Sequence, residues 1–498
     1  MDVAGLALDP FERQAEAFLK ARSWREWQFL SGQRPGRGLV SLYERDFPNF
    51  TSTDLWADLQ AATPEEPRQL RELSELLASA NIEGRTRTYA VNATRVEASA
   101  QVVLGDTEIA WREAAARWPL LIDAPRRHDL EQAWRDVIKS ELNPTLEPWQ
   151  EAMRAQLPAL GPEDWLAFWS RLRGIEPAQP SQLAELVLQS TEALFGHGLS
   201  VYLAQVGLPI DDVWQSDIDW AFRASRFDVI FPEHLRMPLL IRVHRDLGIE
   251  LTEQSNLHLE YGPLPGVRTI PLDVPGETHV VQRLTGGWQD YANSLTGLGW
   301  AQHLVQTDPS LRFWERWLGD ETPHLASGRL FEALLHDRTW LAARLDYVAS
   351  DDFVVISQLA RLYRIRQTAA EAAYEQRLWQ AEPGASLAAT YEEVLTGATR
   401  TRHFSDEYLR ILLGSPWSTL RPAVELRADV FAAQVRAFLR REFDEEWWHS
   451  GRAARFIKDE LWRPGKRHSA EELLGFMGYE GLDPAILAAE FEEVLRSL

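Results

Sequence analysis

The sequence predicts a mainly α-helical protein with two lobes and one small β-sheet. Apolar residues recur at helical spacing through most of the chain, and alternating, strand-like patterns are confined to residues 256–283. The chain has 498 residues, more than one typical hydrophobic core accommodates. We therefore expect an N-terminal helical lobe over 1–205 and a second lobe over 206–498.

The first lobe is predicted from a long run of helical patterns. Residues 10–30 place apolar side chains on one helical face, and Pro10 falls in the first turn, where proline is tolerated. Later helices, including ones over 85–103 and 106–118, are separated by proline and glycine breaks. This pattern favours helical hairpins without strands.

The second lobe is predicted to contain the only sheet, at about 256–283. Leu257, Leu259 and Tyr261 alternate with polar residues, and two more extended segments follow at 267–270 and 278–282. Glycine and proline clusters separate the three segments. We expect a meander or hairpins here.

A helix over 290–305 is expected directly after the sheet. Gly286 and Gly287 interrupt the preceding segment, and Asp290 is a candidate N-cap. Apolar residues then recur at helical spacing. Further helices are predicted to residue 443, followed by a helical tail over 444–498.

Composition and charge limit the possible functions. The formal net charge of −22 argues against binding of nucleic acid or an anionic membrane and favours a basic peptide or protein partner. The absence of cysteine excludes disulfides, thiolate zinc sites and cysteine nucleophiles. No signal peptide or membrane span is recognisable, so we expect a cytoplasmic protein.

The predicted order of elements resembles the zinc oligopeptidases of the thimet oligopeptidase and oligopeptidase F type. In that family a helical lobe precedes a small sheet, and the sheet leads into a helix that carries an H-E-x-x-H motif. Residues 295–303 keep the frame of that motif at Gly299, Ala301 and His303. The C-terminal segment also resembles the family, so the likeness extends over most of the chain.

The resemblance implies that the zinc chemistry has been lost. Two histidines four residues apart and a later glutamate hold zinc in the family, and a glutamate beside the first histidine acts as the general base. The matching positions here are Thr296 and Trp300 for the histidines, Gly297 for the base and Leu325 for the third ligand. None is a suitable zinc ligand or base. We therefore expect no catalytic residues and no cofactor, with the family's zinc absent and with Trp300 and Leu325 in contact across the former metal position.

The resulting hypothesis is a catalytically inactive peptidase homologue, a pseudopeptidase, that holds an extended peptide or a protein partner between its lobes. The family binds peptides along an edge strand of the small sheet. The corresponding candidates here are Val267, Arg268, Thr269, Ile270, Trp300 and His303.

Two alternatives remain open. One is an active peptidase with a relocated metal site, for which His303, His324 and a carboxylate are the candidates. The other is a structural or regulatory subunit whose groove has closed.

Overall fold

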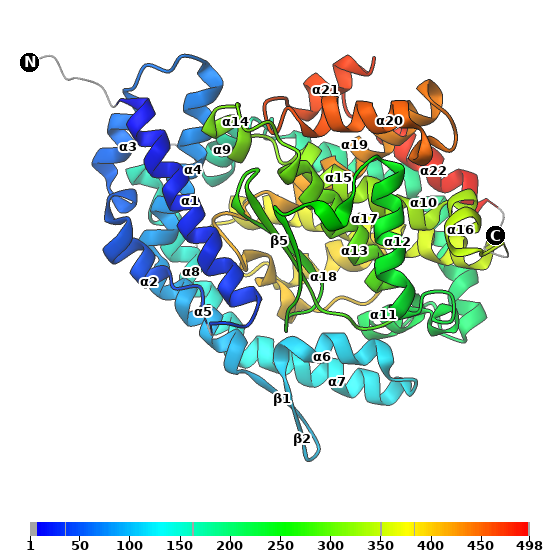
Figure 1. The fold of residues 1–498 in the computed structure, drawn as a ribbon. Helices are drawn as coiled ribbons and strands as arrows, with labels where there is room; N and C mark the ends of the chain where they lie inside the picture. The colour runs from blue at the N-terminus through cyan, green and yellow to red at the C-terminus, as the bar shows by residue number, and fades with distance from the viewer. Residues whose placement is uncertain (1–6, 35, 162–163, 349–350, 383, 497–498) are drawn as a thin grey trace, which may run out of the picture.

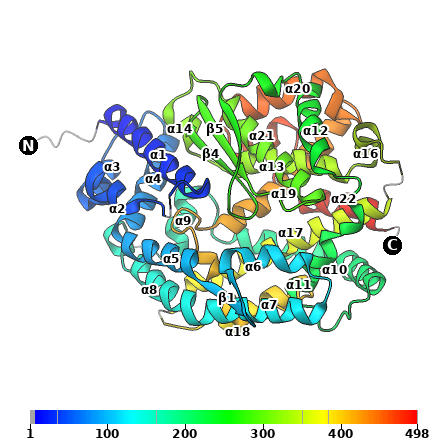
Figure 2. The same ribbon diagram turned by 60° about the horizontal axis from the view of Figure 1, so that its bottom comes forward.

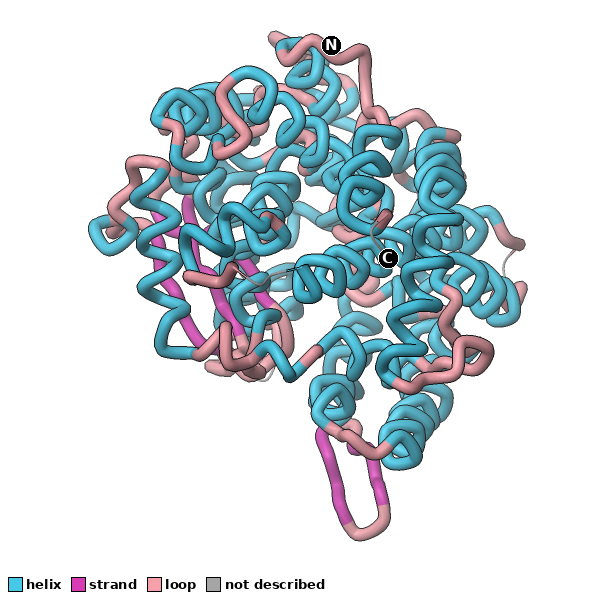
Figure 3. The backbone as a smooth tube through the Cα atoms, turned by 90° about the vertical axis from the view of Figure 1, so that its right-hand side faces the viewer, coloured by secondary structure: helices cyan, strands magenta, loops and turns pink. Residues whose placement is uncertain are grey.

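The computed structural model describes residues 7–34, 36–161, 164–348, 351–382 and 384–496. Helices form most of it, as the sequence predicts, and the strands are few and short (Figure 1; Figure 3). No described helix is long and apolar enough to cross a membrane.

Two large hydrophobic cores organise the chain, and the longest helix, α17 (Asp351–Gln380), belongs to both. Its first half contributes residues such as Phe353 and Leu362 to the core of the second lobe. Its last turns contribute Tyr374 and Trp379 to the core of the first lobe. One continuous helix therefore joins the two lobes, in addition to the other contacts between them.

The first core is built mainly from the N-terminal helices, with α18 (Ala388–Thr399) added from late in the chain. Its N-terminal helices are α1 (Leu8–Leu30), α2 (Leu39–Ser41), α3 (Thr53–Gln60), α4 (Pro67–Arg85), α5 (Arg87–Ser99), α6 (Trp111–Arg117), α7 (Ala124–Val137), α8 (Asn143–Arg154) and α9 (Trp165–Arg173).

The second core begins with α10 (Gln179–Val206), which packs against α17 and α22. Because α9 belongs to the first core and α10 to the second, the chain passes from one core to the other near residue 174. The other helices of this part are α11 (Gln215–Arg223), α12 (Glu233–Asp246), α13 (Trp288–Val305), α15 (Thr322–Glu332), α16 (Arg338–Leu345), α19 (Arg421–Glu442), α20 (Gly451–Phe456), α21 (Ala470–Phe476) and α22 (Pro484–Leu495). The short helix α14 (Phe313–Trp317) packs in the first core.

The predicted sheet is present, but its strand order is not that of a meander. The strands β3 (Leu257–Tyr261), β5 (Glu277–Gln282) and β4 (Val267–Asp273) lie in the order β3-β5-β4. β5 pairs in parallel with β3 and antiparallel with β4, so only β4 and β5 form a hairpin. α13 covers one face of this sheet and α1 covers the other (Figure 1; Figure 2).

A second sheet, which the sequence analysis did not predict, corrects the expected helices over 85–103 and 106–118. Strands β1 (Gln101–Leu104) and β2 (Thr107–Ala110) form an antiparallel hairpin that projects from the body (Figure 1; Figure 3). Gly105, with φ +59°, opens its two-residue turn, a position that a residue with Cβ enters only with strain. The β-branched run before that glycine favours a strand over a helix.

α13 begins as the glycine pair predicts, although its cap differs. Gly287 is the N-cap residue, with φ 80°, and Gly286 has φ 91°. Asp290 lies in the first turn instead, and its carboxylate accepts hydrogen bonds from the backbone N–H groups of Thr285 and Gly286. The aspartate therefore fastens the incoming loop to the helix.

α13 and α15 approach each other so closely that only glycine fits at two positions. A Cβ on Gly299 would meet the backbone of α15, 2.8 Å from the Gly328 Cα, and a Cβ on Gly328 would lie 2.9 Å from the Thr296 carbonyl oxygen. Backbone atoms cannot move aside as a flexible side chain can. The two glycines therefore set the separation of these helices.

We predict that Gly299→Ala lowers the free energy of unfolding by about 2–3 kcal/mol, because the methyl group forces the two backbones apart. Gly397→Ala in α18 is the matched control, since nothing lies within 4 Å of its added Cβ. That control should leave stability unchanged or raise it by up to about 1 kcal/mol. Urea denaturation of both variants measures the difference, and equal stabilities would contradict the close approach.

Candidate functional site

The Trp300 side chain contacts the backbone of Leu325, the residue expected opposite it. Trp300 on α13 donates a hydrogen bond from its indole Nε1–H to the Leu325 carbonyl oxygen on α15, at 3.0 Å. Leu325 is buried, and Trp300 is partly buried against the apolar residues of the sheet. The indole therefore spans the gap between the two helices and satisfies a backbone acceptor there.

The residues at the four family positions do not fit a zinc ion. Trp300 and Leu325 offer no ligand atoms, and Thr296 is a buried hydroxyl. A Cβ on Gly297 would lie 2.5 Å from Val267 Cγ2 and 2.9 Å from Val280 Cγ1. The sheet therefore fills the space that a general-base side chain at this position would need.

The alternative ligands His303 and His324 lie near each other, with ring centroids 5.3 Å apart. His303 donates from Nε2–H to the Gly465 carbonyl oxygen at 3.0 Å, and the Nδ1 atoms of both rings have no hydrogen-bond partner among the described residues. Burial lowers the pKa of His303 to about 4 and lowers the pKa of His324 well below its usual value. Both rings are therefore neutral at pH 7, but no third donor lies close enough to join them within the part of the chain that the structure describes.

One group of three potential metal ligands is present elsewhere in the described residues: His258, Glu277 and His279. These residues lie on the sheet, on the face that α1 covers. The sequence analysis did not single them out, although alternation within strands places Glu277 and His279 on one face. The sequence alone does not reveal that β3 pairs in parallel with β5, and this pairing brings His258 beside His279.

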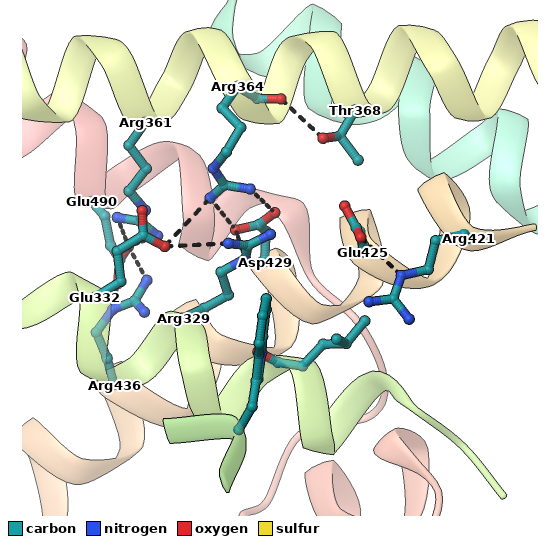
Figure 4. A network of polar contacts seen from close by, with 12 residues as sticks. Arg329, Glu332, Arg361, Arg364, Thr368, Arg421, Glu425, Asp429, Arg436 and Glu490 are labelled. Atoms are coloured by element: carbon teal, nitrogen blue, oxygen red, sulfur yellow. Dashed lines mark hydrogen bonds and ion pairs between the residues drawn. The ribbon is translucent and has the colours of Figure 1, made fainter. Parts of the chain in front are cut away.

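A buried network of ion pairs lies behind α15 and joins four helices (Figure 4). Arg364 of α17 binds the Asp429 carboxylate of α19 through two hydrogen bonds of 2.8 and 3.0 Å, and Arg329 of α15 lies 3.5 Å from the same carboxylate. Glu490 of α22 similarly binds Arg361 and Arg436. Burial by itself would raise the pKa of Asp429, but the two arginines lower it to about 2. Each charge has a partner, so the network fixes the helix arrangement.

The outer edge of β4 has backbone groups that pair with no other strand among the described residues, although the Val267 carbonyl oxygen accepts from the Arg268 side chain. The Arg283 N–H donates to the Gly266 carbonyl, and the register then directs the backbone groups of Arg268 and Ile270 toward β5 and those of Val267 and Thr269 away from it. No other strand pairs with this edge among the described residues. An extended peptide has at this edge the hydrogen-bonding groups that a further strand needs.

The predicted peptide-contact side chains do not all face this edge. Ile270 packs beneath α1 beside Phe29, and His303 is buried against Gly465. The Thr269 hydroxyl donates to the Gly297 carbonyl oxygen at 3.0 Å. Thr269 is therefore available through its backbone and Arg268 through its side chain, whereas the Val267 carbonyl oxygen already accepts a hydrogen bond from Arg268.

A cavity of about 480 Å³ lies between the start of β4 and the N-terminal helices. Aromatic side chains form part of its wall, and its charged lining residues are Arg37, Arg112, Arg268, Arg410, Glu26 and Glu97. Four arginines against two glutamates give this cavity a positive charge, in contrast to the net charge of −22 of the whole chain.

Arg268 is the cavity arginine without an ion pair. Arg37 pairs with Glu26, Arg112 with Glu97, and Arg410 with a nearby glutamate. Arg268 makes one hydrogen bond, to the carbonyl oxygen of Val267, and no carboxylate pairs with it among the described residues. The arrangement favours an anionic group beside Arg268.

No known protein-family profile matches the sequence, and no curated protein sequence matches it. Solved structures of peptidases do match its fold. A structure of oligoendopeptidase F has a TM-score of 0.70 and 13% identity, with 100% of this chain and 94% of that chain covered. An M32 carboxypeptidase from Deinococcus radiodurans R1 has a TM-score of 0.60 and 13% identity, with 97% and 98% covered. A carboxypeptidase from Pyrococcus furiosus has a TM-score of 0.54 and 13% identity, with 97% of each chain covered.

These likenesses define the class of fold, which is that of a helical zinc metallopeptidase. More narrowly, the chain has the architecture that oligoendopeptidase F shares with the M32 carboxypeptidases. At such low identity the likeness establishes the fold and not the activity.

We predict that the free energy of unfolding decreases as the pH falls from 6.5 toward 4. The unfolded chain binds protons at its histidines in this range, whereas buried His303 and His324 stay neutral until the pH reaches their lowered pKa. A histidine with the lowered pKa of His303 costs about 1.6 kcal/mol of stability between pH 6.5 and pH 5. Because the pKa of His324 is also lowered by burial, His324→Gln should reduce the loss between these two pH values.

Urea denaturation at pH 6.5 and pH 5 checks this prediction. His449→Gln is the control, because His449 lies at the surface with 48% of its side chain exposed. An unchanged pH dependence in His324→Gln would show that this ring is protonated in the folded protein.

Proposed function

We propose that this protein is a catalytically inactive peptidase homologue that binds an extended, acidic peptide along β4. The observation that carries the proposal is the pair of contacts at the former active site. Trp300 bonds to Leu325 where the resemblance places the metal, and Gly297 packs against the sheet where it places the base. The adjacent strand edge pairs with no other strand among the described residues.

The former metal position has the character of a packed core. Removing three ligands from a zinc site without filling it would leave a polar void and lose packing energy. The indole of Trp300 occupies the gap between α13 and α15 and gives its one N–H a partner. Hydrolysis by zinc needs an open coordination position and a bound water, and the residues here provide neither.

The arginines that line the cavity beside β4 support an acidic peptide as the ligand. A strand added at Val267 and Thr269 runs past the unpaired Arg268 and the other cavity arginines. An acidic side chain of the peptide would complete an ion pair there. The basic partner expected from the overall charge would have to contact the outer surface instead.

The two alternatives have less support. A relocated metal at His303 and His324 lacks a third ligand in the described part of the chain. A closed groove does not accord with a cavity of about 480 Å³ next to a free strand edge.

We predict that the purified full chain does not cleave a mixed pool of fluorogenic peptides, with or without added Zn²⁺, because its residues supply no zinc-bound water and no base at the former active site. An active oligoendopeptidase F assayed in parallel is the positive control. Cleavage that stops on addition of a chelator and returns with zinc would contradict the proposal of inactivity.

A second prediction concerns the strand edge. Fluorescence anisotropy should detect binding of labelled ten-residue peptides with alternating glutamate, and binding of the lysine counterparts should be at least about tenfold weaker, a difference of about 1.4 kcal/mol. Thr269→Pro removes an outward N–H that an edge strand does not need for its own pairing. This variant should bind the acidic peptides at least tenfold more weakly.

The matched control is Thr269→Val, which loses the same hydroxyl but keeps the N–H and should bind normally. Arg268→Gln should abolish the preference for acidic peptides while retaining weak binding of both. Absence of binding to either peptide set, or normal binding by Thr269→Pro, would contradict the proposal.

A further inference from the structure

Three side chains on the sheet face that α1 covers combine the donor atoms of a transition-metal site. His258 on β3 and His279 on β5 are directly paired in the parallel register, and their rings stack with centroids 4.6 Å apart. Glu277 precedes His279 by two residues and so shares its face. One donor atom from each of the three residues falls within 4.8 Å of the other two.

The hydrogen bonds of His279 leave one ring nitrogen with an electron pair that can bind a cation. Its Nδ1–H donates to the Glu260 carboxylate at 2.6 Å, and the other oxygen of Glu260 accepts from the Trp27 indole N–H of α1 at 2.9 Å. In the neutral ring that carries its proton on Nδ1, Nε2 has a free electron pair. Nε2 lies 3.0 Å from a Glu277 carboxylate oxygen. Two electron-pair acceptors this close are stable only with a proton or a metal ion between them.

The surrounding residues match the usual support of a metal-bound histidine. A carboxylate that holds the second N–H of the ring fixes its orientation and increases its basicity. Here Glu260 is that carboxylate, and the Trp27 indole N–H donates a hydrogen bond to Glu260. His279 is buried, whereas the Glu277 side chain is 45% exposed, so an ion can enter from the Glu277 side.

We propose that His258, Glu277 and His279 bind one divalent transition-metal ion, with Zn²⁺ as the best match, and that Glu260 is the positioning residue. Two imidazole nitrogens and one carboxylate oxygen suit zinc and not calcium or magnesium, which prefer oxygen ligands throughout. In a tetrahedral site with bonds of about 2.0 Å, neighbouring ligand atoms lie about 3.3 Å apart. The Nε2 to Glu277 distance is near this value, and a donor atom of His258 lies within 4.8 Å of both ligands.

The metal would tie the first lobe to the sheet. Its three ligands come from β3 and β5, while Glu260 connects His279 to α1 through Trp27. A ligand that binds only the folded state stabilises it in proportion to its affinity and concentration. Zinc bound here therefore strengthens the contact between α1 and the sheet without any part in hydrolysis.

The test measures zinc affinity by isothermal titration calorimetry on the chelator-treated full chain, together with metal content by elemental analysis after dialysis. The wild-type protein should bind one Zn²⁺ per chain and no Ca²⁺. Glu277→Gln and His258→Ala should each weaken zinc binding at least tenfold, and Glu260→Gln should weaken it by about 10–100-fold. Zinc should also raise the melting temperature of the wild-type protein but not that of His258→Ala.

The control is His449→Ala, which removes a surface histidine and should leave the affinity unchanged. His258 is only partly buried, whereas His279 is buried. The His258→Ala variant therefore keeps the test valid if a substitution of His279 fails to fold. Absence of zinc binding in the wild-type protein, or equal affinity in Glu277→Gln, His258→Ala and wild type, would overturn the proposal and leave a proton between His279 and Glu277. Failure of peptide binding at β4 would not affect these outcomes, because the peptide edge contributes no ligand.

Discussion

The close contact between α13 and α15 is the constraint on which the rest of the structure depends. Glycines at 299 and 328 let the two backbones meet, and the Trp300 indole closes the contact by bonding to the Leu325 carbonyl oxygen. α15 is held from behind by the ion-pair network, in which Arg329 shares Asp429 with Arg364. Burying charges is costly unless each is paired, so this network specifies one position for α15 and thereby one position for the indole.

The same helix fixes the sheet on its other side. Gly297 allows Val267 and Val280 to lie against α13, and the Thr269 hydroxyl bonds to the Gly297 carbonyl oxygen. β4 is consequently held by side-chain contacts along its face and by β5 along one edge, which leaves the other edge unpaired but rigid. Exposed edges invite aggregation. A charged Arg268 and a proline at 271 on this strand discourage pairing with a second copy while still permitting a short peptide.

The sequence was most informative where local signals agreed with the final packing. The Gly286-Gly287 pair marked the start of α13, and alternation marked the strands between 256 and 283. The family resemblance directed attention to Trp300 and Leu325, and the structure joins them through a hydrogen bond to the Leu325 backbone. The hairpin at Gln101–Ala110 was missed because helical periods on both sides concealed the turn at Gly105. The β3-β5-β4 order, and with it the pairing of His258 with His279, depends on a crossover that no local pattern encodes.

The central strand β5 connects the two proposed sites physically. Its Glu277 and His279 side chains face α1, its Val280 side chain faces α13, and its backbone holds β4 in register. A metal on the α1 face would restrain β5 against both its neighbours, which lowers the entropy that β4 loses when a peptide is added. The effect requires no change in the groove and no metal at α13. Under these two proposals, a metal in a fold of the peptidase type would act by organising the sheet that presents the peptide edge.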